Sequence, residues 1–240
     1  MPNTFFRFKQ FTIHQQHAAL KVSTDSCLFG AWIGSKVGGE GYKAEMIFDI
    51  GAGTGLLMLM LAQKCNAFIE GIEIDKPSYE QAKENAAASP WVNRLQLYLG
   101  DVKEFVFEKK YDLIISNPPF YENDLKSDAA NRNIAMHDEG LKLDELMRIA
   151  EMNLNPAGKF AVLLPYFRAE KFIETAKKNN VHLCSRMDVK QTPNHSFFRT
   201  MLILGKQKTE SEIQSMTIKD ENDQYTPAFA ALLKDYYLYL

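Results

Sequence analysis

Cysteine is scarce in this sequence. The 240 residues include three, Cys27, Cys65 and Cys184, and their wide spacing matches neither a zinc knuckle nor a C-x-x-C motif. The histidines are also scattered, without the spacing of metal ligands. We therefore expect reduced thiols and no metal site.

Long hydrophobic runs are absent as well. The densest run, residues 56–62, has seven residues, whereas a membrane-spanning helix needs roughly 20. Residues 1–11 place Arg7 and Lys9 among single aromatic residues, so they lack the continuous apolar core of a secretory signal. The sequence therefore predicts a cytoplasmic protein without membrane contacts.

Neither sign of charge dominates the chain. There are 28 Lys and Arg residues against 30 Asp and Glu residues, a formal net charge of −2. This balance excludes a uniformly basic nucleic-acid-binding protein, although it leaves room for a local basic face. The 46% of hydrophobic and 24% of charged residues are ordinary for a globular protein. Since no repeat or low-complexity linker interrupts the chain, we expect one domain over residues 1–240.

Short apolar runs alternate with helix-length amphipathic segments from about residue 45. This alternation is typical of the α/β class, in which helices flank a parallel sheet. The predicted strands are Met46–Ile50, Phe68–Ile74, Leu95–Leu99, Leu113–Ser116, Phe160–Leu164, Val181–Met187 and Phe198–Leu204. The predicted helices are Leu56–Lys64, Pro77–Ala88, Leu143–Asn153 and Arg168–Asn179, with an earlier helix running through Ile33 behind an N-cap cluster of Thr24, Asp25 and Ser26.

The last two predicted strands flank a short polar stretch, residues 188–196. A parallel return would need a crossover of a dozen or more residues, so these two strands should pair antiparallel. We therefore predict a seven-stranded, mostly parallel sheet with an antiparallel C-terminal hairpin and helices on both faces.

A glycine-rich loop follows the first predicted strand. Gly51, Gly53 and Gly55 lead directly into the next helix, where glycines let a ligand approach the backbone. The G-x-G-x-G spacing lacks the third small residue of the dinucleotide fingerprint, which disfavours a dehydrogenase. Asp49 lies at the carboxyl end of the strand, where open α/β sheets bind ligands.

Carboxylates also follow the next two strands. Glu73 lies about 20 residues beyond the glycine loop, a position suited to accepting hydrogen bonds from ribose hydroxyls. Asp75 precedes Lys76-Pro77 and is interpreted as the cap of the following helix. Asp101 follows the third strand and suits either an exocyclic amine of a ligand or the cap of a further helix.

The sequence Asn117-Pro118-Pro119-Phe120 ends the fourth strand. Two consecutive prolines fix φ and remove two N–H donors, so the loop is rigid and rich in acceptors. The Asn117 side-chain oxygen, the Pro118 carbonyl and the Phe120 ring together suit a planar heterocycle that bears an NH₂ group.

These two motifs carry a family resemblance. Asp49-Ile50-Gly51-Ala52-Gly53-Thr54-Gly55 together with Asn117-Pro118-Pro119-Phe120 resembles the class I S-adenosylmethionine-dependent methyltransferases that modify planar amino nitrogens. The resemblance implies a Rossmann-like class I methyltransferase fold, S-adenosylmethionine as cofactor, and catalysis by Asn117, Pro118 and Phe120. It also implies that Asp49, Gly51, Gly53, Gly55, Glu73, Asp101 and Asn117 bind the cofactor.

A closer resemblance covers nearly the whole chain. It is to the bacterial tRNA1(Val) (adenine(37)-N6)-methyltransferase family, and it is carried by Phe8-Lys9-Gln10-Phe11, Lys21-Val22 with Thr24-Asp25, Gly30-Ala31-Trp32, Ser89-Pro90-Trp91, Phe229 and Tyr237–Leu240. The usual Gly-Thr-Asp-Gly of the family is Ser23-Thr24-Asp25-Ser26 here. The resemblance implies that Lys21 and Thr24 bind the cofactor and that residues 1–35 contribute to the substrate and cofactor cleft. It further implies a monomer that methylates N6 of adenosine 37 in a tRNA anticodon stem-loop.

Charge is unevenly distributed along the chain. Residues 159–208 hold ten basic residues against three acidic ones, and no acid lies between Asp188 and Glu210. Aromatic residues accompany the bases, which suits backbone neutralisation and base stacking by an RNA; the aromatic residues of positions 5–11 suit either RNA contact or the core. The predicted substrate-binding residues are Phe120, Arg132, His137, Lys190 and Arg199.

Three other functions fit parts of this sequence. The same catalytic loop would serve a methyltransferase acting on N5 of a protein glutamine or on N2 of a ribosomal RNA guanine. An RNA chaperone that binds S-adenosylmethionine without catalysis would predict a broken Asn-Pro-Pro-Phe loop, and this loop is intact.

Overall fold

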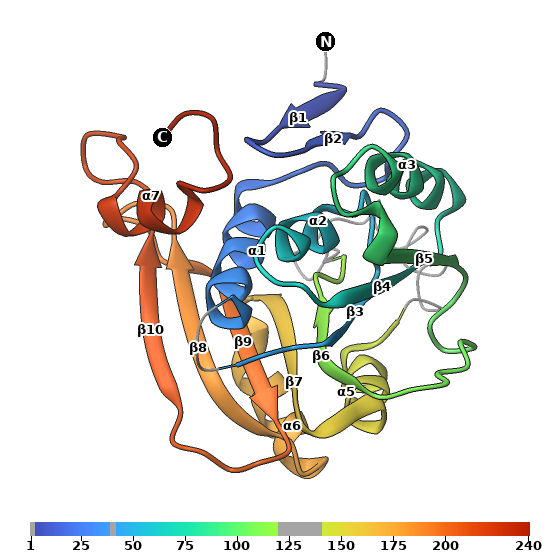
Figure 1. Cartoon of the computed structure of the whole chain (residues 1–240). Helices are drawn as coiled ribbons and strands as arrows, with labels where there is room; N and C mark the ends of the chain where they lie inside the picture. Colours follow the sequence, from blue (N-terminus) through green and yellow to red (C-terminus); the bar gives the residue numbers. More distant parts are fainter. Residues whose placement is uncertain (1–2, 39–41, 120–140) are drawn as a thin grey trace, which may run out of the picture.

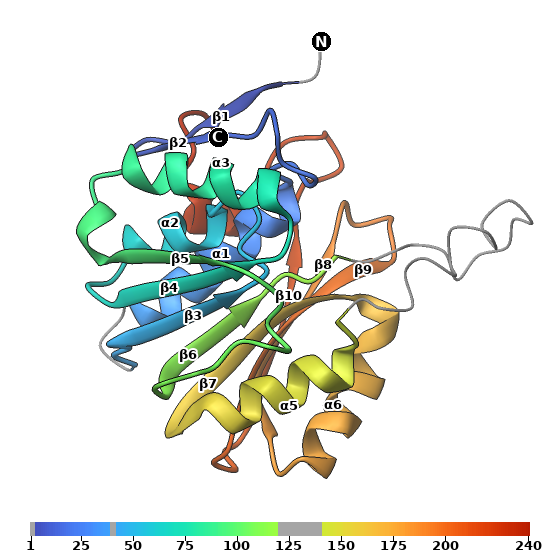
Figure 2. The same cartoon turned by 90° about the vertical axis from the view of Figure 1, so that its right-hand side faces the viewer.

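The computed structural model of the chain describes residues 3–38, 42–119 and 141–240. A large, mostly parallel sheet crosses the molecule and carries helices on both faces, and a small ribbon of two short strands lies apart from it (Figures 1 and 2). The strands are β1 (Phe5–Arg7), β2 (Thr12–His14), β3 (Met46–Ile50), β4 (Phe68–Glu73), β5 (Leu95–Leu99), β6 (Tyr111–Ser116), β7 (Leu154–Pro165), β8 (His182–Lys190), β9 (Phe197–Gly205) and β10 (Glu212–Thr217). The helices are α1 (Thr24–Val37), α2 (Leu56–Ala62), α3 (Lys76–Ala87), α5 (Leu143–Asn153), α6 (Ala169–Lys178) and α7 (Pro227–Leu233), with 3₁₀ turns η1 (Val92–Arg94) and η2 (Tyr166–Arg168).

The strand order of the large sheet is β10-β8-β9-β7-β6-β3-β4-β5. The predicted α/β class is confirmed, and so is the antiparallel hairpin, formed by β8 and β9. The predicted number of strands is wrong, because β10 adds an eighth strand parallel to β8 at the edge. Four of the six β10 residues are polar and most are exposed, so the strand lacks the apolar run by which buried strands are recognised.

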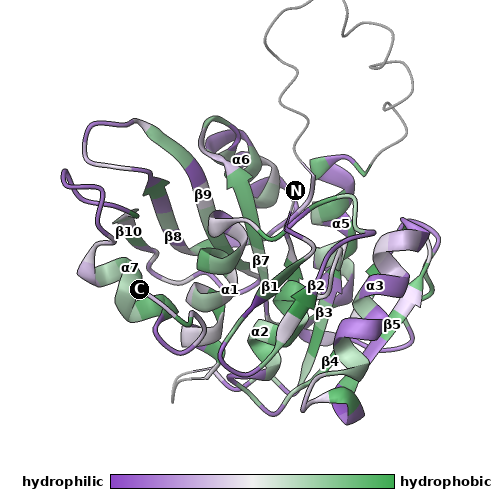
Figure 3. Ribbon diagram, turned by 90° about the horizontal axis from the view of Figure 1, so that it is seen from above, coloured by the Kyte–Doolittle hydropathy of each residue, from purple (hydrophilic) through white to green (hydrophobic). Residues whose placement is uncertain are grey.

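Hydrophobic side chains on the two faces of the sheet form two separate clusters. Ile47, Leu113 and their neighbours pack against α1 and α2, whose apolar residues are buried. On the opposite face, Phe48 and Phe160 pack beneath α5 and α6. Figure 3 shows hydrophobic residues along the central strands, and Figure 2 shows the two helical layers on either side. No helix in the described ranges combines the length and apolar character needed to cross a membrane.

The start of α1 differs from the prediction. The N-cap is Ser23, one residue before the predicted Thr24, Asp25 and Ser26 cluster. Its side chain accepts from the Ser26 amide, and the Ser26 hydroxyl accepts from the Ser23 amide at 3.1 Å. This reciprocal capping box satisfies two amides at the helix end. It also gives a physical role to Ser23 and Ser26, the two positions at which the resemblance predicts glycine.

The two ends of the chain pack together beside α1 (Figure 1). Phe8 forms an antiparallel bridge with Tyr237, and the Lys9 amide donates to the Tyr236 carbonyl at 2.8 Å. Phe8 and Phe11 are 2% and 7% exposed and their rings stack at 4.5 Å. Of the two interpretations left open for this aromatic block, core packing therefore holds for these two residues.

Glu70 is a buried carboxylate at the centre of β4. It accepts hydrogen bonds from Tyr111 Oη at 2.6 Å and Tyr98 Oη at 2.9 Å, and Lys109 Nζ lies at 3.2 Å. Burial, together with Glu70, raises the pKa of Tyr111, so its phenol stays protonated and donates. These contacts compensate for taking Glu70 out of water.

Replacing Tyr111 with Phe should lower the free energy of unfolding by about 1.5–3 kcal/mol, the usual value of a hydrogen bond to a charged group. Urea unfolding followed by circular dichroism measures this loss. Tyr98→Phe is the matched control, with a smaller loss expected because Tyr98 is only half-buried. Equal unfolding midpoints for wild type and Tyr111→Phe would contradict this account of Glu70.

Candidate active site

The register of the parallel strands brings the predicted site residues to one edge of the sheet. Ile50 pairs with Ile72 and with Ser116, and Glu73 pairs with Leu99. The loops that follow β3, β4, β5 and β6 therefore leave the sheet side by side, with strand axes about 4.8 Å apart. The Ser116 hydroxyl donates to the Ile50 carbonyl at 2.8 Å and joins the ends of β6 and β3 directly.

The glycine loop runs from the end of β3 into α2 with a left-handed backbone. Gly51, Gly53 and Gly55 have φ values of 76°, 55° and 78°, a region that disfavours side chains. A Cβ atom at Gly51 or Gly53 would meet nothing within 4 Å. The loop therefore borders open space on the side of these two glycines, as a backbone that receives a ligand requires.

Asp49 lies on β3 just before this loop and is fully buried. Neither of its carboxylate oxygens has a hydrogen-bond partner among the described residues. Burial, and secondarily the charge of Glu73, raises the pKa of Asp49 from 3.8 to about 8. A buried carboxylate without a partner is energetically costly, so this position fits a ligand that brings a cation or an N–H donor.

Glu73 fixes the glycine loop from the end of β4. Its Oε2 accepts from the Gly53 amide and its Oε1 from the Asp75 amide, both at 2.8 Å. A carboxylate oxygen has two lone pairs, so each oxygen retains room for one more donor such as a hydroxyl. The Asp75 side chain accepts from the Ser78 amide at 3.0 Å, which confirms Asp75 as the cap of α3.

Asp101 lies beyond Gly100 at the end of β5, and the Gly100 amide donates to the Glu73 carbonyl at 3.0 Å. One Asp101 oxygen accepts from the Lys103 amide at 2.9 Å, and the other lies 3.5 Å from Lys103 Nζ. Asp101 therefore shapes a turn rather than capping a helix. Its position beside Glu73 leaves its predicted role in cofactor binding as a proposal.

The first three residues of the Asn-Pro-Pro-Phe loop lie in the described part of the chain. Asn117 follows Ser116 at the edge of the sheet and is half-buried, Pro118 is buried and Pro119 is exposed. Because Ser116 pairs with Ile50, Asn117 leaves the sheet next to the glycine loop. Phe120, Arg132 and His137 lie outside the described residues, so their predicted roles remain predictions.

The segment between β2 and α1 is attached to the glycine loop and to α3. The Asn85 side chain donates from Nδ2 to the Thr54 and His14 carbonyls and accepts from the His14 amide, all at 2.9 Å. The Ala19 amide donates to Ser78 Oγ at 3.2 Å. The sequence prediction did not include Asn85 or Ser78, because a helix residue that bonds a distant backbone leaves no local pattern.

The same segment reaches the hairpin at its other end. Asp25, in the first turn of α1, accepts from Arg199 Nε at 2.8 Å. Lys21 and Thr24 are exposed along this segment. The segment therefore crosses the edge of the sheet from α3 to β9, and the two predicted cofactor residues lie on it.

Cations and aromatic rings gather where β7 and β8 end and β9 begins. Lys190 Nζ lies 5.7 Å from the centre of the Phe197 ring, and the Arg199 guanidinium lies 5.4 Å from that of Phe198. The Tyr166 ring lies 5.2 Å from the Phe197 ring. The structure thus brings the predicted substrate residues Lys190 and Arg199 to the same hairpin.

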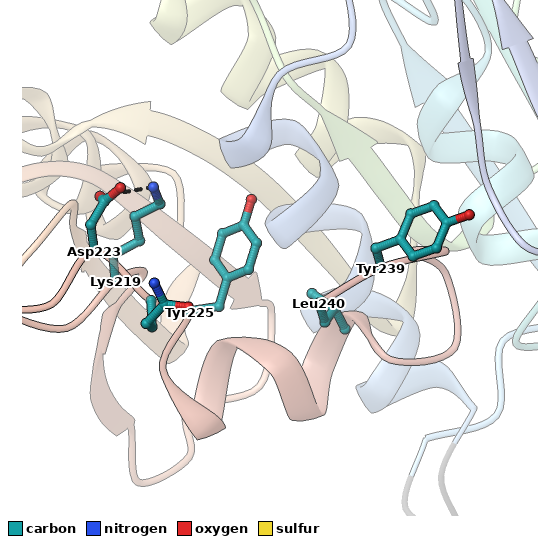
Figure 4. A pocket seen from close by; sticks show the side chains of 6 residues that line it. Lys219, Asp223, Tyr225, Tyr239 and Leu240 are labelled. Atoms are coloured by element: carbon teal, nitrogen blue, oxygen red, sulfur yellow. Dashed lines mark hydrogen bonds and ion pairs between the residues drawn. The ribbon is translucent and has the colours of Figure 1, made fainter.

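A hollow of about 290 Å³ lies apart from these residues, between the segment that precedes α7 and the carboxyl terminus. Tyr225, Tyr239 and Leu240 line it together with an ion pair of Lys219 and Asp223 (Figure 4). Its lining includes none of the predicted site residues. Across the described ranges, no three His, Cys, Asp or Glu side chains are placed to hold a metal ion together.

Comparison with known proteins agrees with this geometry. Residues 39–181 match the family described as methyltransferase small domain. The tRNA1(Val) (adenine(37)-N6)-methyltransferase of Phocaeicola vulgatus is 38% identical, with 99% of each chain covered. The enzyme of the same name from Trichodesmium erythraeum is 40% identical over 97% of each chain.

The fold recurs in a solved structure of low sequence identity. A protein described as a predicted O-methyltransferase from Agrobacterium tumefaciens superimposes with a TM-score of 0.63 at 16% identity, covering 88% of this chain and 96% of the other. The identities of the relatives extend over nearly the full length of the chain, including the N-terminal segment and the hairpin. The chain is a methyltransferase and belongs to the methyltransferase small-domain family and, within it, to the tRNA1(Val) (adenine(37)-N6)-methyltransferases.

Proposed function

We propose that this protein transfers a methyl group from S-adenosylmethionine to N6 of adenosine 37 in the anticodon loop of tRNA1(Val). The observation that carries the proposal is the pairing of Ile50 with Ser116, which sets the Asn117 loop beside the glycine loop. The names of the full-length relatives support the choice of substrate.

The residues at the sheet edge fit the chemical groups of S-adenosylmethionine. The unpartnered Asp49 carboxylate suits a cationic group, and the open backbone of Gly51 and Gly53 allows close approach of the ligand. Glu73 retains acceptor capacity for ribose hydroxyls, and we assign Asp101 to the exocyclic amine. Lys21, Thr24, Gly55 and Asn117 complete the proposed binding set.

When bound, S-adenosylmethionine supplies an electrophilic methyl group on a sulfonium. The adenine amino nitrogen is a weak nucleophile, because its lone pair is delocalised into the ring. Asn117 Oδ1 and the Pro118 carbonyl accept its two N–H bonds, which favours a pyramidal nitrogen and stabilises the positive charge that develops on it. Phe120 stacks on the extruded base, and the methylated nitrogen loses its proton to water.

The proposed RNA-binding face comprises the hairpin and the segment that crosses the sheet edge. Lys190 and Arg199 contact the anticodon stem-loop, together with Arg132 and His137. Residues 1–35 form part of the cleft within a single methyltransferase domain over 1–240. We propose that the protein acts as a monomer in the cytoplasm, without a membrane or metal partner.

A labelling experiment distinguishes this substrate from the other candidates that carry a planar amino nitrogen. The purified protein is incubated with tritiated S-adenosylmethionine and with tRNA, bulk ribosomal RNA or total protein from a strain that lacks the modification. We expect label in tRNA. Label confined to protein would indicate a glutamine, label confined to ribosomal RNA would indicate guanine N2, and either result would overturn the proposal.

Replacing Asn117 with Ala should reduce kcat by about 10²–10³-fold or more, the cost of removing one hydrogen bond made in the transition state. Affinity for S-adenosylmethionine should fall far less than kcat, because the other residues of the proposed binding set remain. Radiometric transfer and calorimetric binding measure the two quantities. Asn153→Ala, at the end of α5, is the control and should retain activity. Full activity of Asn117→Ala would contradict this mechanism.

Asp49 should release a proton when a cationic ligand binds. Its pKa of about 8 means that it is mostly protonated at pH 7, whereas pairing with a cation favours the ionised form. Calorimetry at pH 7 in two buffers of different ionisation enthalpy should show release of about one proton with S-adenosylmethionine. Asp49→Asn should abolish this release and weaken binding. Unchanged release in the variant would contradict the assignment.

The same raised pKa affects stability. Between pH 4 and pH 8 the folded chain binds a proton at Asp49 that the unfolded chain does not, so this residue lowers the free energy of unfolding as pH rises through that window. Denaturant unfolding of wild type and Asp49→Asn across this range isolates the contribution. Between pH 5 and pH 8 the free energy of unfolding should fall less for the variant than for wild type. Parallel curves of this free energy against pH would contradict the burial cost assigned to Asp49.

A further inference from the structure

We propose that a hollow at the tip of the β8–β9 hairpin binds an unpaired base of the RNA from the same loop as the base that is methylated. This inference rests on the proposed function, because it takes RNA as the substrate. The hollow measures about 500 Å³ and is lined by Gln191, His195, Ser196, Phe197 and Phe198. Its volume lies within the roughly 300–1,000 Å³ of sites for small organic groups.

The register places this hollow on the edge that carries Asn117. β6 pairs with β7 through Ser116 and Val162, and β7 pairs with β9 through Pro165 and Arg199. β6 and β7 both end on this edge, and β9 begins there. The strand β9 is therefore two strand spacings, about 10 Å, across the sheet from β6, and Phe197 lies four residues, about 13 Å, beyond the level of Asn117 along β9. Another unpaired nucleotide of the same opened loop can span such a separation while the target base is extruded.

Phe197 supplies a stacking surface supported from two directions. The Tyr166 ring lies 5.2 Å away at an interplanar angle of 32°, and Lys190 Nζ lies 5.7 Å from the ring centre. Stacking of a base on an aromatic side chain contributes about 1–3 kcal/mol, and a nearby cation adds to it. An aromatic ring beside a cation is thus suited to a base that carries its own phosphate.

Polar groups around the ring can read the edge of a base. Gln191 and Ser196 are exposed and offer an amide and a hydroxyl. The His195 ring is held by a 2.7 Å contact between its Nδ1 and Thr192 Oγ1. These groups lie on the loop that joins the paired strands β8 and β9.

The charges around the hollow favour a polyanion. No acid occurs between Asp188 and Glu210 in the sequence. The acids packed nearest are paired, since Arg186 contacts both Asp188 and Glu170, and Arg199 contacts Asp25. An RNA phosphate beside the Phe197 ring therefore meets a cation in Lys190, whose Nζ donates to the neutral Pro193 carbonyl at 3.4 Å.

A coupling experiment tests the inference. The substrate is an unmodified anticodon stem-loop RNA and its variants, each with one abasic nucleotide at an unpaired position other than the target. Wild type and Phe197→Ala are compared by kcat and KM on every RNA. We expect Phe197→Ala to raise KM on the intact RNA about five-fold, the lower end of the stacking range, with little change in kcat.

The expected signature is one abasic position that raises KM for wild type but causes no further increase for Phe197→Ala. Phe197→Trp should behave as wild type, and Phe197→Leu should behave as the Ala variant while keeping the apolar volume. Phe68→Ala, at the amino end of β4 on the opposite edge of the sheet, is the control for loss of an exposed ring and should leave KM unchanged.

If every abasic position raised KM by the same factor for wild type and for Phe197→Ala, the two changes would be independent. This result would overturn the inference while leaving the proposed function intact. Transfer of methyl groups to protein alone by the wild type would overturn both. An unchanged KM of Phe197→Ala on the intact RNA would also refute the stacking role. The unfolding midpoint of each variant, measured in urea, confirms that the compared proteins are folded.

Discussion

Parallel hydrogen bonding between β6, β3, β4 and β5 is the constraint on which the rest of the site depends. Each strand contributes one chemical group where it ends, and the register decides that these groups emerge together. The glycine loop, Glu73 and Asn117 are far apart in sequence and neighbours only because Ile50 pairs with both Ile72 and Ser116. A shift of one residue would turn every side chain of a strand to the opposite face.

Two buried carboxylates on adjacent strands differ in their hydrogen-bond partners, and this difference distinguishes a structural group from a ligand-binding one. Glu70 is enclosed by donors from Tyr98, Tyr111 and Lys109, so its charge is compensated within the fold. Asp49 is equally buried but has no partner among the described residues. Unsatisfied buried polar groups are rare in native proteins and require an explanation. At the edge of a ligand-binding sheet, the simplest explanation is a group supplied by the ligand.

The sequence allowed the parallel strands and their terminal residues to be predicted, because strands buried on both faces are continuous apolar runs with a sharp end. The strand-ending prolines after Asn117 and the cap at Asp75 follow from local chemistry in the same way. Long-range contacts left no such pattern. The Asn85 contacts to Thr54 and His14, the Asp25–Arg199 ion pair and the polar edge strand β10 all depend on partners distant in sequence.

The central claim is that this edge of the sheet delivers a methyl group to one amino nitrogen of one nucleotide. The most direct measurement is mass spectrometry of nuclease fragments of unmodified tRNA1(Val) after incubation with the protein and S-adenosylmethionine, with chromatography of the released nucleosides to separate N6-methyladenosine from its ring-methylated isomers. The account predicts a single added methyl group, on N6 of adenosine 37. A methyl group on any other nucleotide, or on a ring nitrogen of adenosine 37, would contradict it.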